Sequence, residues 1–211
     1  MTKHLIAIVI IIVVIITFSH NFNRIKLCIQ SLLHISNISS MPLHKKNTDI
    51  LINYLIKDEN VYEKFIDFGC GSGNIISQLI KSNYKINKII GIEICKLSYK
   101  KALKYTKYKN VFIKNMSMVD YKFTNVPTIL YFYEPLWNMK NNLLKKQIYT
   151  TIFNNFKHVK NITIIYITSS YTSDLKDPFF ISNNLVLKTR FKIAGDIPFI
   201  KTATFNVWIR K

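Results

Sequence analysis

The sequence predicts an α/β fold: an open parallel β-sheet with helices on both faces, a C-terminal antiparallel β-hairpin, and one hydrophobic helix in front of the domain. Short continuous runs of Ile, Val, Tyr and Phe alternate with helical segments, which is typical of a buried parallel sheet. A glycine-rich segment joins the first such run to a helix. Two β-rich runs near the C-terminus have no helix between them, which predicts the hairpin.

The composition excludes several classes of protein. The 211 residues suit one ordinary domain with an extension, and a hydrophobic content of 49% excludes a globally disordered chain. Three cysteines, an odd number, exclude a disulfide-dense secreted scaffold. Five glycines and five prolines exclude a collagen-like or low-complexity protein.

The net charge of +19 raises the question of a nucleic-acid partner. However, the chain is rich in Ile, Lys and Asn, with 36, 27 and 21 residues, and these types have A/T-rich codons. It contains only three Arg, the residue whose fork matches phosphate. Nucleic acid is therefore the less favoured partner.

The N-terminal segment is almost entirely apolar. Leu5–Phe18 forms a run of 14 residues, and continuing to Phe22 gives about 18, close to the length of a membrane span. A soluble buried helix is disfavoured because the run has no helical period. A cleaved signal peptide is disfavoured because no small-x-small cleavage site follows. We interpret residues 1–22 as a membrane anchor.

The flanking charges predict how this anchor is oriented. Basic residues gather on its C-terminal side: Arg24, Lys26, Lys45 and Lys46. By the positive-inside rule the body of the protein then faces the cytosol, which also suits its free cysteines. Residues 23–44 form a linker, and the catalytic or binding domain spans 45–211.

The elements of the domain follow from hydrophobic patterning. A helix begins at Thr48 or Asp49 and carries its apolar residues on one face. Further helices are expected at 74–80, 97–108 and 143–156. Strands are expected at 64–68, 88–93, 111–113, 128–133 and 162–168, and the hairpin strands at 185–193 and 202–210.

The stretch that indicates chemistry follows the first strand. It reads Asp67-Phe-Gly69-Cys-Gly71-Ser-Gly73 and opens a helix. Glycines allow a sharp turn and a close approach of the backbone to a ligand, and the helix start offers free N–H groups. Glu93 ends the next strand twenty residues later, where an acid can accept the hydroxyls of a ribose.

This layout resembles motif I of the class I S-adenosylmethionine-dependent methyltransferases. The dinucleotide fingerprint fits less well, because Asn74 stands where its third glycine belongs. The resemblance covers roughly residues 45–211 and implies a Rossmann-like methyltransferase sheet that binds S-adenosyl-L-methionine. It places Gly69, Gly71 and Gly73 beside the donor's methionine part, with Asp67 shaping the loop.

The resemblance extends to the later strands. It implies that Glu93 binds the ribose, that Ile94 and Met116 flank the adenine, and that Asn115 bonds the edge of the adenine. Tyr133 and Glu134, at the end of the fourth strand, lie where the methyl acceptor docks, and we expect them to be the catalytic residues. No His or Cys spacing indicates a metal site, and none is expected.

The acceptor is the most open part of the prediction. Base-methylating members carry Asn/Asp-Pro-Pro-aromatic after the fourth strand, whereas this chain has Tyr133-Glu-Pro135-Leu. With its single proline after the fourth strand and its hydrophobic N-terminus, the chain distantly resembles the ATP synthase c-subunit lysine methyltransferase family. It resembles equally well a bacterial family that carries Tyr-Asn-Pro-Phe at this place. We expect a protein acceptor, with lysine as a candidate, or a small molecule. The alternatives are a non-catalytic, membrane-tethered binding module and a nucleic-acid methyltransferase.

Overall fold

The computed structural model describes residues 45–58, 60–82, 84–133, 136, 141–169, 177–197 and 200–210. The chain divides into two units at Ile38, and every described residue belongs to the second, Ser39–Lys211. The predicted anchor (1–22) and linker (23–44) therefore lie outside the described residues. Within the part that is described, no helix is both long enough and apolar enough to cross a membrane.

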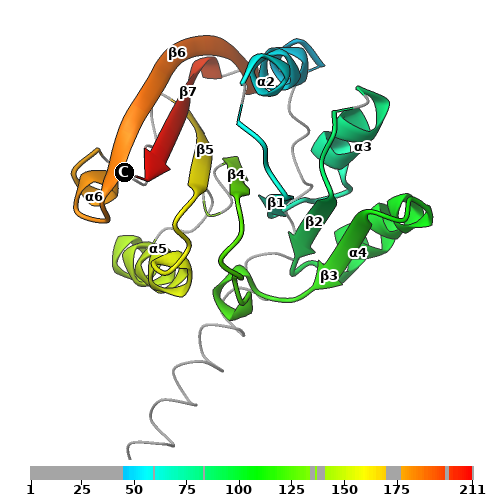
Figure 1. The fold of residues 1–211 in the computed structure, drawn as a ribbon, viewed down its shortest axis with the longest axis horizontal. Coiled ribbons are helices and arrows are strands. Elements are labelled where there is room, and N and C mark those ends of the chain that lie inside the picture. Colours follow the sequence, from blue (N-terminus) through cyan, green and yellow to red (C-terminus); the bar gives the residue numbers. More distant parts are fainter. Residues whose placement is uncertain are drawn as a thin grey trace, which may run out of the picture. The chain divides into compact units, whose positions relative to one another are not determined.

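The domain is built on one seven-stranded sheet with the order β3-β2-β1-β4-β5-β7-β6 (Figure 1). Strands β1 to β5 are parallel, and β7 runs antiparallel to both β5 and β6. The strands are β1 Lys64–Phe68, β2 Lys88–Glu93, β3 Val111–Asn115, β4 Thr128–Tyr133, β5 Ile162–Ser169, β6 Leu185–Ile197 and β7 Ile200–Arg210.

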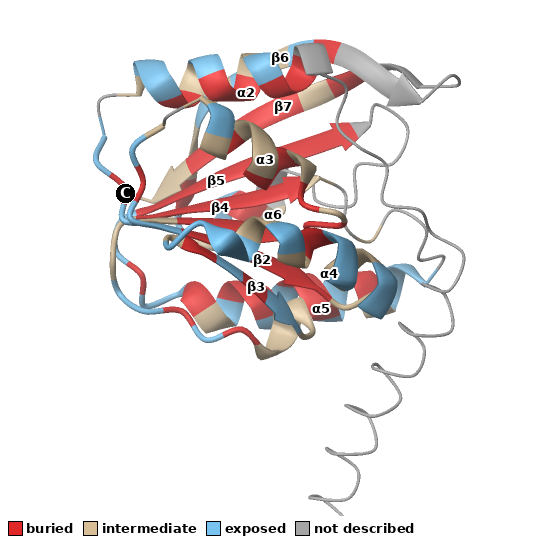
Figure 2. Ribbon diagram, turned by 90° about the vertical axis from the view of Figure 1, so that its right-hand side faces the viewer, coloured by how far each residue is buried: buried red, intermediate tan, exposed pale blue. Residues whose placement is uncertain are grey.

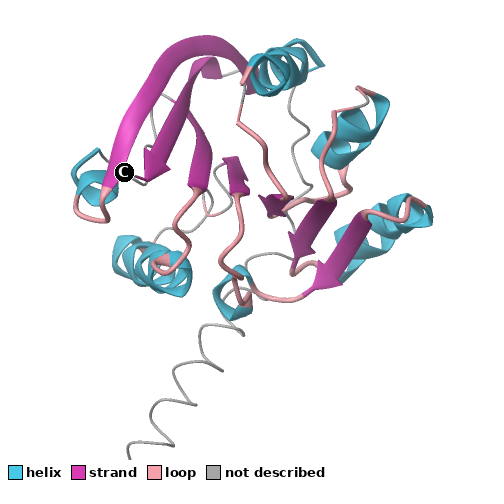
Figure 3. Ribbon diagram, viewed as in Figure 1, coloured by secondary structure: helices cyan, strands magenta, loops and turns pink. Residues whose placement is uncertain are grey.

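Helices cover both faces of this sheet (Figures 1 and 3). Helices α2, α3 and α4 lie on one face, and α5 and α6 lie on the other. The helical elements are α2 Lys45–Lys57, α3 Asn74–Lys81, α4 Lys96–Ala102, α5 Asn142–Phe156 and α6 Asp177–Ile181, with 3₁₀ turns η1 Leu103–Lys107 and η2 Met118–Asp120.

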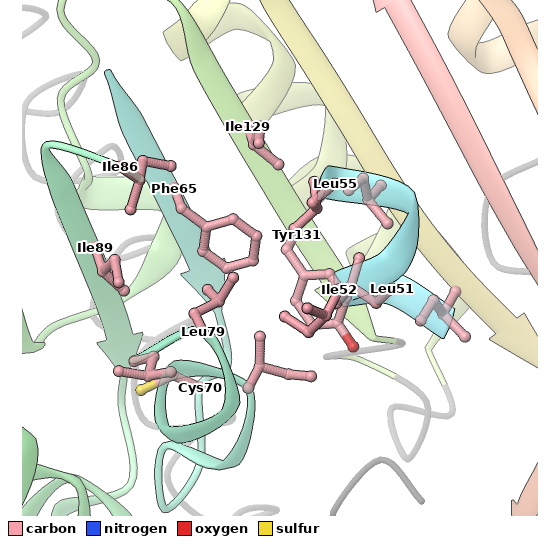
Figure 4. Close-up of a cluster of buried hydrophobic side chains, with 14 of the residues drawn as sticks. Leu51, Ile52, Leu55, Phe65, Cys70, Leu79, Ile86, Ile89, Ile129 and Tyr131 are labelled. Carbon is pink, nitrogen blue, oxygen red and sulfur yellow. The ribbon is translucent and has the colours of Figure 1, made fainter. Parts of the chain in front are cut away.

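The face under α2, α3 and α4, which we call the aliphatic face, has a mainly aliphatic core. Leu51 and Leu55 of α2 and Leu79 of α3 pack against Ile89 and Ile129 of the sheet (Figure 4). The strand residues in this cluster alternate with those on the opposite face, as the two-residue period of a strand requires. Figure 2 shows how completely the central strands are buried between the two helix layers.

The face under α5 and α6, which we call the aromatic face, is packed mainly with rings. Phe180 of α6 stacks on Trp208 of β7 with ring centroids 4.5 Å apart and an interplanar angle of 5°. Phe153 of α5 contacts Phe156 and Phe180 in tilted and edge-on geometry. Such ring pairs stabilise a core beyond the area that they bury.

Most of the predicted elements are confirmed with bounds that agree within two residues, and three of them differ more. Helix α2 begins at Lys45, so Thr48 and Asp49 lie inside it and do not cap it. The predicted helix 97–108 is α4 followed by the 3₁₀ turn η1, in which the Thr106 hydroxyl donates to the carbonyl of Leu103 at 2.7 Å. Strand β6 continues through Gly195, which was expected in the hairpin loop.

Helix α6 was not predicted. It has only five residues, too few to show a helical period. Its position depends on tertiary packing, since Phe179 and Phe180 both contact Phe153 of α5. A helix this short is unstable alone and is held by the rings beneath it.

Candidate functional site

The glycine loop between β1 and α3, residues 69–73, has a backbone that only glycine adopts easily. Gly69, Gly71 and Gly73 have φ angles of 77°, 55° and 84°. Side-chain-bearing residues rarely take these values, because Cβ approaches the neighbouring carbonyl oxygen. All three predicted glycines are therefore required by the conformation of the loop.

Hydrogen bonds fasten this loop to the second strand and to α3. The N–H groups of Gly69 and Cys70 both donate to the carbonyl of Ile92, at 2.9 and 3.1 Å. Gly73 N–H donates to Cys70 O, and Ser77 N–H then donates to Gly73 O, each at 2.9 Å. The loop thus closes into a tight turn that leads directly into the first turn of α3.

Two positions near the loop have a role that sequence reasoning missed. A Cβ at Gly73 would lie 2.7 Å from Cε2 of Tyr105, so η1 packs its ring directly on the third glycine of the motif. A Cβ at Gly91 would lie 2.8 Å from the Cys70 sulfur and 2.8 Å from the Ile76 side chain. A glycine inside a buried strand is the signal that marks such a close approach.

The Glu93 carboxylate connects the glycine loop to the end of β2. Its Oε2 accepts the N–H of Gly71 at 2.8 Å, and its Oε1 accepts the N–H of Cys95 at 2.7 Å. Burial raises the pKa of Glu93, and these backbone donors oppose that rise. Each carboxylate oxygen has two lone pairs, so both oxygens keep capacity for a further donor.

The Asp67 carboxyl lies on the aliphatic face at the end of β1 and is buried, with 3% of its surface exposed. No described residue donates a hydrogen bond to it. Burial, together with the negative charge of Glu93, raises the pKa of Asp67 to about 8. The end of β1 therefore carries a carboxyl group that is poised to take either a proton or a cationic partner.

The end of β3 lies beside the end of β2, because Asn115 is aligned with Glu93 in the parallel register. The Asn115 amide donates to the carbonyls of Glu93 and Ile94 at 2.8 and 3.1 Å. Met116 N–H also donates to Glu93 O, at 3.2 Å. Ile94 and Met116 are both half-buried beside this point. The structure thus brings the predicted cofactor residues together from three adjacent strand ends.

The predicted catalytic pair is described only in part. Tyr133 is the last residue of β4 and is half-buried. In the sheet, β1 lies between β4 and β2, the strand that ends in Glu93. Glu134 lies outside the described residues. Among the described residues no group of three His, Cys, Asp or Glu side chains is arranged to hold a metal ion.

Comparison of the fold with solved structures gives clear matches. The N-methyltransferase NodS from Bradyrhizobium japonicum WM9, in complex with S-adenosyl-L-homocysteine, matches with a TM-score of 0.63 and 7% identity, over 87% of this chain and 98% of that one. The magnesium protoporphyrin IX methyltransferase ChlM from Synechocystis PCC 6803, with bound S-adenosylmethionine, matches with a TM-score of 0.61 and 12% identity, over 80% of each chain. The domain has the class I methyltransferase fold.

The strand order of this methyltransferase fold and its C-terminal antiparallel hairpin confirm the predicted fold class. No protein-family model matches the sequence, and no curated protein matches it either. Similarity to the ATP synthase c-subunit lysine methyltransferase family therefore stays a prediction. The shared fold places the glycine loop, Glu93 and Asn115 at the carboxyl ends of the strands, where open α/β sheets bind their ligands.

Proposed function

We propose that the protein is an S-adenosylmethionine-dependent methyltransferase anchored in a membrane by residues 5–22, with its domain facing the cytosol. The observation that carries the proposal is the bond between the Gly71 N–H and the Glu93 carboxylate, 2.8 Å long. It joins the glycine loop to the acid predicted to hold the ribose. The two motifs are 22 residues apart in sequence and form one site in space.

The glycine loop and Glu93 suit the polar parts of the donor. Glu93 is fixed by two backbone N–H groups and keeps acceptor capacity on both oxygens for two ribose hydroxyls. The glycines allow the methionine part of the donor to approach the loop backbone closely. Because both features are held in place beforehand, little ordering is needed when the donor binds.

Asp67 suits the positive charge of the donor. Its buried carboxyl has a pKa raised to about 8, and a cation beside it would favour the ionised form. We assign Asp67 the role of shaping the loop and facing the cationic methionine part. Binding is then expected to release a proton below about pH 8.

The adenine of the donor fits at the end of β3, on the other side of Glu93 from Asp67. The Asn115 amide uses its NH₂ group for two backbone carbonyls, which leaves its oxygen as the acceptor for the adenine amino group. The half-buried side chains of Ile94 and Met116 supply apolar surface for the two faces of the base.

Tyr133 and Glu134 are proposed to receive the acceptor at the end of β4. The bound donor supplies an activated methyl group, so the protein needs mainly to position the nucleophile in line with it. Glu134 holds a lysine ammonium or comparable amine and takes its proton, and the ring of Tyr133 lies against the cation. The proposed acceptor is a protein, with lysine as the candidate residue, or a small molecule.

A non-catalytic, membrane-tethered binding module is the second candidate. It is favoured because Tyr133-Glu134-Pro135-Leu136 stands where base-methylating members carry Asn/Asp-Pro-Pro-aromatic. The two candidates differ in methyl transfer and agree on binding of the donor.

Methyl transfer from a radiolabelled donor to a membrane fraction tests the proposal. We expect the full-length protein to label an acceptor and Glu134→Gln to abolish labelling while the donor still binds. Glu63→Gln, which removes an exposed acid at the amino end of β1, serves as the matched control and is expected to label normally. Donor binding without labelling of any protein or small molecule would support the binding module.

A further inference from the structure

One end of the sheet carries a dense group of exposed lysines. The segment 85–119 runs through β2, α4, η1 and β3, and it contains nine lysines. All nine are exposed, and the only acid in the segment, Glu93, is buried with 8% of its surface exposed. We call this group the lysine edge: Lys85, Lys88, Lys96, Lys100, Lys101, Lys104, Lys107, Lys109 and Lys114.

These elements belong together in space. Strand β3 is the edge strand of the sheet, β2 is its neighbour, and α4 and η1 both pack on β3. Figure 1 shows them grouped at one end of the sheet, and Figure 2 shows that much of α4 is exposed. The positive charge is therefore collected at the β3 end of the sheet, with no exposed acid in the same segment.

Aromatic rings lie among these lysines. Tyr108 and Phe112 are 40% and 43% exposed, and they are the two rings among the exposed large hydrophobic side chains of the described residues. The ammonium of Lys107 lies 5.4 Å from the ring centre of Tyr108, and that of Lys88 lies 6.0 Å from Phe112. Alternating cations and exposed rings are typical of surfaces that bind single-stranded nucleic acid.

The A/T-rich codon bias does not account for this arrangement. Nine of the 27 lysines fall in 35 of 211 residues, about twice the density that an even spread would give. Codon bias also does not expose rings among them. Lys88 and Lys114 repel a further cation beside them: burial lowers the pKa of the neighbouring Lys64, and the charges of these two lysines lower it further. A polyanion would relieve this repulsion.

We propose that the lysine edge binds single-stranded nucleic acid, with the ammonium groups on phosphates and the rings of Tyr108 and Phe112 stacked on bases. A single strand is favoured over a duplex, because a side chain can stack only on a base face that is not already stacked on neighbouring bases. This proposal goes beyond methyl transfer and does not depend on it. An anionic lipid surface could also bind these lysines, but it would not stack on the rings of Tyr108 and Phe112. Lipid binding is therefore the alternative that the test must distinguish.

The test is the fluorescence anisotropy of a labelled uridine oligonucleotide of about 12 residues with the full-length protein, between about 50 and 200 mM salt. The edge variant replaces Lys88, Lys107 and Lys114 with Gln. The control variant replaces three exposed lysines elsewhere, Lys57, Lys146 and Lys160, with Gln, so both lose the same charge. We expect the edge variant to bind about tenfold more weakly, with a salt slope lower by about 2, and the control to change much less.

Phe112→Leu separates stacking from charge. It is expected to weaken binding about fivefold or more while the salt slope stays unchanged. A thymidine oligonucleotide of the same length tells RNA from DNA. The proposal is overturned if the wild type does not bind, or if the edge and control variants weaken equally. It is also overturned if the edge variant loses binding to phosphatidylserine vesicles and keeps its binding to the oligonucleotide.

Discussion

The two faces of the sheet differ in what fills them and in the role that we propose for each. On the aromatic face, ring contacts run from Phe68 of β1 through Phe132 and Tyr166 to Phe180 and Trp208. On the aliphatic face, the same strands end in Asp67, Gly91 and Glu93, where side chains become small or polar. Under the proposed function, the donor binds at the strand ends of the aliphatic face, whereas the ring packing on the aromatic face contributes to stability. Variants on each face are therefore expected to have separable effects.

The largest expected effect is on the aromatic face. Phe180→Ala removes a buried ring that stacks on Trp208 and contacts Phe153, so it should lower the free energy of unfolding by about 3–5 kcal/mol. Denaturant unfolding measures the loss. The protein that remains folded should bind the donor as the wild type does, and a large loss of affinity would break the separation of the two faces.

Gly91→Ala tests the packing of the aliphatic face beneath the site. The added Cβ would lie 2.8 Å from the Cys70 sulfur, so the variant should lose about 1–3 kcal/mol of unfolding free energy. Combining it with Cys70→Ala should restore part of the loss, measured as a double-mutant cycle. Strict additivity of the two changes would mean that the contact is not the cause.

Asp67→Asn tests the buried carboxyl through the dependence of stability on pH. The folded pKa of about 8 lies above the value near 3.9 expected in the unfolded chain, so the folded state retains a proton that the unfolded state loses. Wild-type stability should therefore fall as the pH rises from about 4 to 8. In Asp67→Asn this fall should shrink by at least about 1 kcal/mol, and urea unfolding at several pH values measures it. Identical pH profiles would show that Asp67 ionises normally.

Gly73→Ala is expected to have the smallest effect. Its φ of 84° strains any L-residue, and the new Cβ meets the ring of Tyr105, at a total cost of about 1–2 kcal/mol. The double variant with Tyr105→Leu removes the steric part and keeps the strain. If thermal unfolding shows no recovery in the double variant, backbone strain alone explains the requirement for glycine.

The sequence predicted the parts of the molecule that local chemistry determines. Continuous apolar runs predicted β1 to β5. The spacing of Asp67, the three glycines and Glu93 predicted that these residues come together at the ends of β1 and β2, and the Gly71–Glu93 hydrogen bond confirms that they do. Parts that depend on distant contacts were missed. Helix α6 is held by Phe153, the position of Tyr105 over Gly73 depends on the 3₁₀ turn η1, and Gly91 is required by Cys70 and two isoleucines. The hydrogen bonds from the Gly71 and Cys95 N–H groups to the Glu93 carboxylate likewise could not be predicted, because they depend on the folded positions of the loop and the strand end.

The most direct test of the account is calorimetric titration of S-adenosylmethionine into the wild type, Glu93→Gln, Glu63→Gln and Phe180→Leu. Glu93→Gln keeps the size of the side chain but replaces one of the two oxygens that accept the Gly71 and Cys95 N–H groups with an NH₂ donor, and it removes the negative charge. Its affinity should therefore fall at least about tenfold. Glu63→Gln and Phe180→Leu should bind like the wild type, the latter despite its lower stability. Equal affinity in Glu93→Gln and the wild type, or no binding by folded wild type, would contradict the assignment of the aliphatic face as the donor site.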